Sequence, residues 1–161
     1  MSLGFRNVDA DPADPVATWP YEALVVAIER GTVRDWARIT RVVAGDPWGE
    51  VARSVEAYLG YADASGVTAL LRRAVDRSRS EAEAADRATV AARVRQLAAE
   101  SGLTAARFAV RAGTSSSRLS TYATGKVVPS AAMMLRLERV AGQRDDLAVT
   151  AREDSGTAPI D

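Results

Sequence analysis

The chain of 161 residues contains no cysteine and no histidine, and Lys126 is its only lysine. The absence of cysteine excludes disulfides and thiolate chemistry. The absence of histidine removes the commonest general base and the commonest metal ligand, so a Ser/His/Asp triad cannot form. The carboxylates lack metal-ligand spacing, and the single Gly-Lys pair lies after a predicted helix, which excludes a P-loop. We therefore expect no enzyme, no catalytic or metal-binding residue and no cofactor.

Long apolar runs are also missing. No stretch approaches the ~20 residues of a membrane span, and the N-terminal residues lack the basic and apolar segments of a signal peptide. We therefore expect no membrane association and a cytoplasmic location in a bacterium. Apolar residues make up 47% of the chain and charged residues 26%, a balance typical of folded globular domains.

Helical periodicity predicts an all-α fold. The repeated Asp-Pro pairs near the N-terminus disfavour helix and predict a flexible arm. Farther on, Thr32 and Asp35 resemble a capping box. Asp46 and Pro47 have the residue types of an N-cap and a first helical residue. The residues from 67 to 101 contain neither glycine nor proline, which predicts a long helix, solvated in its middle where large apolar residues are missing.

These patterns predict an N-terminal helical bundle joined by a long helix to a second helical domain. The predicted parts are a flexible arm over 1–18, a helical bundle for dimerisation or partner binding over 19–78, a second helical domain over 79–142 and a flexible acidic tail over 143–161. We expect the three tryptophans to be core anchors, namely Trp19, Trp36 and Trp48.

Charge is unevenly distributed, although the whole chain is neutral. Between residues 102 and 142, six basic residues face one acidic residue, a net charge of +5. The basic residues are Arg107, Arg111, Arg118, Lys126, Arg136 and Arg139. A basic patch inside a neutral chain favours phosphate binding.

The stretch 113–130 is either a solvated Ser/Thr-rich linker or part of a helix-turn-helix motif. Ala109, Gly113, Leu119 and Tyr122 have the spacing of that motif. A small residue at 109 allows a close helix crossing, and glycine at 113 permits the positive φ of a sharp turn. Thr114 or Ser115 can cap the second helix. The predicted core of this domain consists of Phe108, Leu119, Tyr122, Met134, Leu135 and Leu137.

The stretch 90–142 carries the segments "VRQLAAESGLT", "FAVRAGTSSSRLSTYATGK" and "PSAAMMLRLERVA". Together they resemble the phage-repressor-like (Cro/XRE-type) helix-turn-helix family. The resemblance implies a repressor-like helix-turn-helix DNA-binding domain over 79–142, with double-stranded DNA as a partner. It also implies that Ser115, Ser116, Ser117 and Thr121 match positions that touch bases or the adjacent DNA backbone, and that Lys126 matches a backbone-contacting position. The full set of predicted DNA-binding residues is Thr104, Arg107, Thr114, Ser115, Ser116, Ser117, Arg118, Ser120, Thr121 and Lys126.

The leading hypothesis is a sequence-specific DNA-binding transcriptional regulator that reads the major groove with helix 115–124. We expect it to be a repressor and a homodimer, and to be associated with the nucleoid when it is bound to DNA. The alternative is an antitoxin or immunity-type regulator, whose N-terminal bundle binds a protein partner such as a toxin while the helix-turn-helix domain represses its operon. A third hypothesis is a small-molecule-sensing repressor, which a buried polar cavity in the bundle would support.

Overall fold

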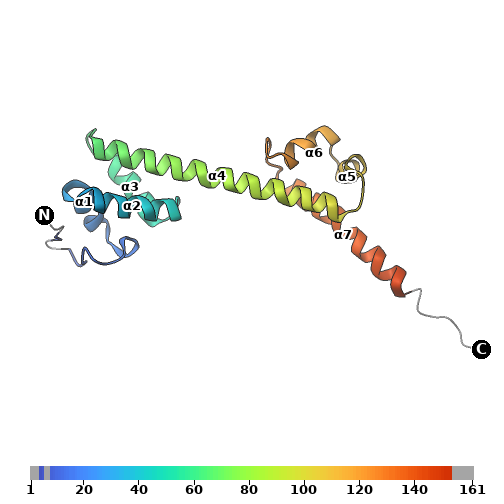
Figure 1. Cartoon of the computed structure of the whole chain (residues 1–161), viewed down its shortest axis with the longest axis horizontal. Coiled ribbons are helices and arrows are strands. Elements are labelled where there is room, and N and C mark those ends of the chain that lie inside the picture. The colour runs from blue at the N-terminus through green and yellow to red at the C-terminus, as the bar shows by residue number, and fades with distance from the viewer. Residues whose placement is uncertain (1–3, 6–7, 154–161) are drawn as a thin grey trace, which may run out of the picture. The chain divides into compact units, whose positions relative to one another are not determined.

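The computed structural model describes residues 4–5 and 8–153 of the chain, and these residues form helices without any strand. The all-α prediction is therefore confirmed (Figure 1). The elements in chain order are the short 3-10 helix η1 (Val16–Thr18) and the α-helices α1 (Tyr21–Arg30), α2 (Val33–Gly45), α3 (Glu50–Leu59), α4 (Gly66–Glu100), α5 (Ala105–Arg111), α6 (Ser116–Ala123) and α7 (Ala131–Glu153).

The contacts divide the chain into two compact units, unit 1 over Met1–Glu83 and unit 2 over Ala84–Asp161. The helix α4 is continuous across this boundary, as its lack of glycine and proline predicts. The sequence places the boundary near residue 79. In the structure, Arg79 still belongs to unit 1, where its guanidinium pairs with the Glu56 carboxylate at 2.6 and 2.7 Å.

Unit 1 is a helical bundle, in which α1, α2 and α3 lie beside the N-terminal part of α4 (Figure 1). One apolar stripe of each helix points inward, which gives a single core. Its largest fully buried side chains are Ile28, Ile39, Val43, Val55 and Leu71.

The N-terminal segment packs on unit 1 instead of forming the predicted free arm. Val16 is buried, and Phe5 stacks edge-on against Trp19 with ring centroids 5.2 Å apart. The Arg38 guanidinium donates to the carbonyl oxygens of Pro12 and Asp14 at 2.6 and 2.7 Å. The Asp-Pro pairs do exclude helix, but apolar contacts and the bonds from Arg38 compensate for the ordering of this segment.

Of the two helix starts predicted in unit 1, one is confirmed and the other is wrong. The capping box of α2 is confirmed, because the Thr32 amide donates to the Asp35 carboxylate at 2.9 Å. The predicted start of α3 at Asp46 is wrong: Asp46 ends α2, and α3 begins at Glu50 with Gly49 as its N-cap.

The tryptophans differ in burial, although the sequence predicts all three as core anchors. Trp19 is buried and Trp36 is half-buried, whereas Trp48 is 46% exposed. Trp48 lies in the turn between α2 and α3, which keeps it out of the helical stripes that form the core.

Unit 2 packs α5, α6 and α7 around the C-terminal part of α4 (Figure 1). Phe108, Leu119, Tyr122 and Leu137 are buried, as predicted. The prediction that Leu135 is buried is wrong, since its side chain is 59% exposed. Other core positions of α7 are Val140 and Ala141.

The last helix also ends later than predicted. The backbone of α7 continues through Gly142 to Glu153, where the sequence predicts a flexible tail from residue 143. A single glycine inside a helix costs only about 1 kcal/mol relative to alanine, so Gly142 does not stop α7. The rest of the predicted tail, residues 154–161, lies outside the described residues.

Candidate nucleic-acid interface

The turn between α5 and α6 has the geometry that the sequence predicts. Thr104 caps α5, because its hydroxyl accepts a bond from the Arg107 amide at 3.4 Å. Gly113 adopts a φ of 74°, which favours glycine. The Thr114 amide then donates to the Ala109 carbonyl at 2.9 Å, closing the turn. The reading of 113–130 as a solvated linker is thereby excluded.

The helix α6 separates a buried face from an exposed one. Ser115 is its N-cap and accepts a bond from the Arg118 amide at 3.2 Å, which settles the choice between Thr114 and Ser115. Leu119 and Tyr122 are buried one turn apart. The exposed residues at the start of the helix are Ser115, Ser116, Ser117, Arg118 and Ser120, while Thr114 and Thr121 are half-buried.

Arg118 and Tyr122 are linked on α6. The Arg118 Nε donates to the Tyr122 hydroxyl at 2.9 Å, across one turn of the helix. Tyr122 itself is buried, so its hydroxyl is a fixed anchor for the arginine. A guanidinium has five N–H donors, and this bond uses the one on Nε. The terminal nitrogens of Arg118 therefore keep their donors for another group.

The segment after α6 holds Lys126 on the surface. Gly125 adopts a φ of 73°, and the Val127 amide donates to the Thr121 carbonyl at 3.2 Å. The Arg95 guanidinium donates to the Ala123 carbonyl at 2.5 Å, which ties α4 to the end of α6. The sequence analysis missed Arg95, because nothing in its spacing indicates a partner so far along the chain.

The start of α7 is capped by a serine. The Ser130 hydroxyl accepts a bond from the Met133 amide at 3.2 Å, and the preceding Pro129 is buried. This cap fixes where the chain turns after Lys126. Exposed Lys126 therefore lies between two firmly anchored points, Gly125 and Ser130.

Three other arginines of the basic patch gather around the turn, and none of them forms an ion pair with a carboxylate of the described residues. Arg111, Arg136 and Arg139 line a surface pocket of about 350 Å³ together with Gly113. Arg111 donates to the Gln143 side-chain oxygen at 2.6 Å. The sequence counts these arginines in the basic patch but does not predict that they cluster. Arg107 is exposed separately on α5.

The structure thus places the ten predicted DNA-binding residues on the exposed or half-buried surface of unit 2. They come from the start of α5, from α6 with its preceding turn, and from the segment before α7. Short hydroxyl side chains dominate the set, and its cations are Arg107, Arg118 and Lys126. Such a surface offers hydrogen-bond donors and positive charge, which suits the phosphates and base edges of duplex DNA.

Comparison with known protein families agrees with this geometry. Residues 89–150 match the family described as a helix-turn-helix domain. The chain therefore contains a helix-turn-helix domain, and the resemblance of 90–142 is confirmed, consistent with phage-repressor-like regulators. No curated protein and no solved structure matches the chain.

The described residues contain no group of carboxylates that could hold a metal ion. No helix among them is sufficiently long and apolar for a bilayer crossing.

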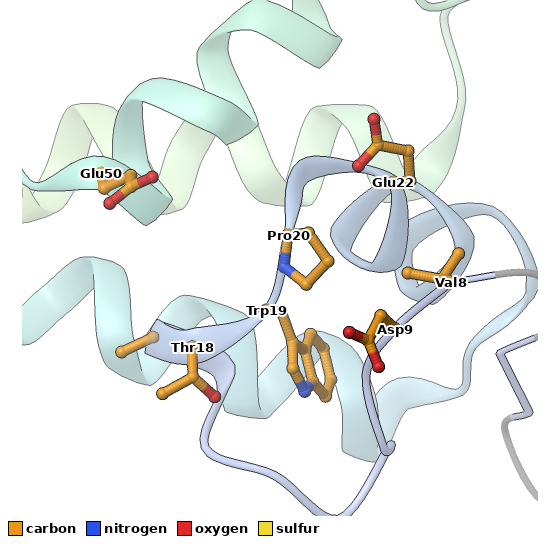
Figure 2. A pocket seen from close by; sticks show the side chains of 8 residues that line it. Val8, Asp9, Thr18, Trp19, Pro20, Glu22 and Glu50 are labelled. Atoms are coloured by element: carbon orange, nitrogen blue, oxygen red, sulfur yellow. The ribbon is translucent and has the colours of Figure 1, made fainter.

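A surface pocket of about 630 Å³ in unit 1 is lined by Trp19 and by Asp9, Glu22 and Glu50 (Figure 2). These three carboxylate residues are exposed, and the Trp19 indole already donates to the Asp11 carbonyl at 3.2 Å. This is an open hollow and not the buried polar cavity that would support a small-molecule sensor.

Proposed function

We propose that this protein is a sequence-specific DNA-binding transcriptional regulator that reads the major groove with α6. The observation that carries the proposal is the two-sided nature of α6. Its buried face, formed by Leu119 and Tyr122, anchors the helix in the core. The residues at its start are all exposed, namely Ser115, Ser116, Ser117 and Arg118. The first turn of a recognition helix is the part that meets base edges.

Contacts to the DNA backbone would set the position of α6 in the groove. Lys126 and Arg107 are exposed near opposite ends of the motif and can neutralise phosphates. Thr104 at the start of α5 can approach the backbone closely because its side chain is short. Base discrimination would then come from Arg118 and, more weakly, from the serines.

We propose further that the regulator is a repressor and acts as a homodimer in the cytoplasm, where it is nucleoid-associated when bound. A symmetric dimer places two recognition helices about one DNA turn apart. The dimer contact must lie outside 104–126, because the exposed face of that segment is committed to DNA. A dimer of this kind can repress by excluding other proteins from its site.

The decisive experiment is selection of bound sequences from a random pool of duplex DNA by the purified full-length protein. We expect an enriched motif with two-fold symmetry and half-sites about one turn apart. An unenriched pool, or equal binding of all duplexes, would refute sequence-specific recognition. A reporter gene behind the selected motif then tests the sign of regulation, and increased expression would contradict repression.

The second candidate is an antitoxin or immunity-type regulator, in which unit 1 binds a protein partner while unit 2 represses the operon. The observation favouring it is a fixed, exposed tyrosine beside two carboxylates in unit 1, described below. Co-purification of a protein from the neighbouring gene, bound through unit 1, would distinguish it from a simple repressor.

A further inference from the structure

A groove in unit 1 lies apart from the helix-turn-helix motif and is built around tyrosines. It has a volume of about 520 Å³, and its walls include the end of α1, the end of α3, the following loop and the start of α4. Its lining includes two tyrosines and two carboxylate residues, namely Tyr58, Tyr61, Glu29 and Asp63.

Tyr61 is exposed yet held in place. Its side chain is 66% exposed, but its hydroxyl shares a 2.9 Å hydrogen bond with the Tyr21 hydroxyl of α1. Its ring stacks edge-on against Tyr58 with centroids 5.5 Å apart. A large aromatic side chain with fixed orientation loses little conformational entropy on binding, which is the property of an interface anchor.

The loop that carries Tyr61 is fixed as well. The amides of Tyr61 and Ala62 donate to the Tyr58 carbonyl at 3.2 and 3.0 Å. Buried Thr68 bonds the Ser65 amide at 2.8 Å and the Asp63 carbonyl at 3.3 Å. The groove is therefore formed before any partner arrives.

Two carboxylates give the groove its charge. No ion pair of the described residues includes Glu29 or Asp63. Both lie close enough to the Tyr58 phenol to raise its pKa, together with burial, which is the larger cause. An aromatic surface flanked by unpaired carboxylates is complementary to a guanidinium group, which stacks on rings and donates to carboxylates.

We propose that this groove is a docking surface for a basic segment of a partner protein, with an arginine side chain inserted between Tyr61 and the carboxylates of Glu29 and Asp63. The inference is independent of the DNA-binding proposal, because all of its residues lie in unit 1 and its test requires no DNA. In the second candidate function, the partner that unit 1 binds would then present a basic segment with an arginine.

The test uses the full-length protein and a fluorescent peptide in which arginine alternates with glycine. A matched peptide carries citrulline, which keeps the shape of arginine but removes its charge. The double variant Glu29→Gln, Asp63→Asn removes the charge of the groove. The control Glu22→Gln, Glu50→Gln removes the same charge from the hollow in Figure 2.

We expect the arginine peptide to bind, and the groove variant to lose about tenfold in affinity (about 1.4 kcal/mol), while the control variant keeps its affinity. Tyr61→Ala should weaken binding similarly, and circular dichroism verifies that each variant is folded. Equal losses in both double variants, equal binding of the citrulline peptide, or no binding at millimolar concentration would overturn the proposal. Equal affinity for spermidine would also overturn it, in favour of a small amine.

Discussion

Arg118 is the one side chain of α6 that can make two parallel hydrogen bonds to a base. Gln and Asn, the other bidentate readers, are absent from 113–124. Its Nε is bonded to buried Tyr122, which restricts where its terminal nitrogens can point. The serines beside it are shorter and bond several base edges equally well. Discrimination between bases is therefore expected to concentrate at Arg118.

The first prediction concerns this residue. We expect Arg118→Ala to relax the preference at one base pair per half-site, worth about 1–3 kcal/mol. Ser116→Ala should cost no more than the ~1 kcal/mol of one hydrogen bond. The measurement is competition binding against operators changed one base at a time. A uniform loss at every operator variant would mean that Arg118 touches only the DNA backbone.

The second prediction compares two glycines of unit 2. Gly113→Ala should lower the free energy of unfolding by about 1–2 kcal/mol, because alanine is strained at a φ of 74°. Gly142→Ala should raise it by about 0.5–1 kcal/mol, because Gly142 lies inside α7 with free space around it. Urea unfolding followed by circular dichroism measures both. A stabilised Gly113→Ala variant would contradict the turn geometry.

At the scale of elements, α1 and the loop after α3 are joined by the bond between Tyr21 and Tyr61. This bond, and then burial, raises the pKa of Tyr21 from 10.0 to about 12. A group whose pKa is raised in the folded state contributes to the free energy of unfolding, and this contribution is fully present at pH values below the pKa of the group in the unfolded state. That contribution is lost as the pH rises from about 10 to about 12.

The third prediction follows from this shift. Phenolate absorbance should show one tyrosine titrating near pH 12 in the folded protein, and Tyr61→Phe should bring its midpoint back toward 10 because the hydrogen bond is gone. The variant should also lose less stability between pH 10 and 12. Tyr122→Phe in unit 2 removes a different phenol as a control. If it lowers that same midpoint equally, the assignment to Tyr21 fails.

Helix periodicity and turn chemistry predicted much of this fold. The turn at Gly113 and the buried pair Leu119 and Tyr122 are local features, so local spacing identifies them, whereas it left Thr114 and Ser115 as alternative helix caps. Leu135 was misassigned because it belongs to a run of apolar residues in which only the neighbouring helices decide which face is buried.

The misassignments in unit 1 depend on contacts between distant segments. The packing of residues 8–18 depends on Arg38, more than twenty residues away along the chain, and composition cannot show such a bond. The tyrosine groove escaped the sequence analysis for the same reason, since Tyr21 and Tyr61 come from separate elements. In the predicted site, the exposure of Arg107, Ser116, Ser117, Arg118 and Ser120 followed from their helical positions. The cluster of Arg111 with Arg136 and Arg139 required the packing of α5 on α7.

At the scale of the whole molecule, charge differs between the two units. Unit 1 has ten basic and thirteen acidic residues, a net charge of −3, and unit 2 has eleven basic and eight acidic residues, a net charge of +3. A polyanion is therefore attracted to unit 2 and repelled by unit 1, although the chain as a whole is neutral. DNA binding should depend strongly on salt for this reason.

The fourth prediction quantifies this dependence. If each subunit of a dimer neutralises about four phosphates, the slope of log K against log salt concentration is about −7. Lys126→Ala should make the slope shallower by about 2, because two subunits each lose one phosphate contact. Arg34→Ala in unit 1 removes the same charge elsewhere and should leave the slope unchanged. A slope near zero for the unaltered protein would exclude this footprint.

The placement of the tryptophans has a consequence for spectroscopy. Trp19, Trp36 and Trp48 all lie in unit 1, and Tyr122 is the only aromatic residue of unit 2 apart from Phe108. Indole fluorescence therefore monitors the melting of unit 1 alone, whereas far-ultraviolet circular dichroism sums the helices of both units. The tryptophans thus report on unit 1 without any added fluorophore. The difference between the fluorescence and circular dichroism melting curves gives the melting of unit 2, which holds the helix-turn-helix motif.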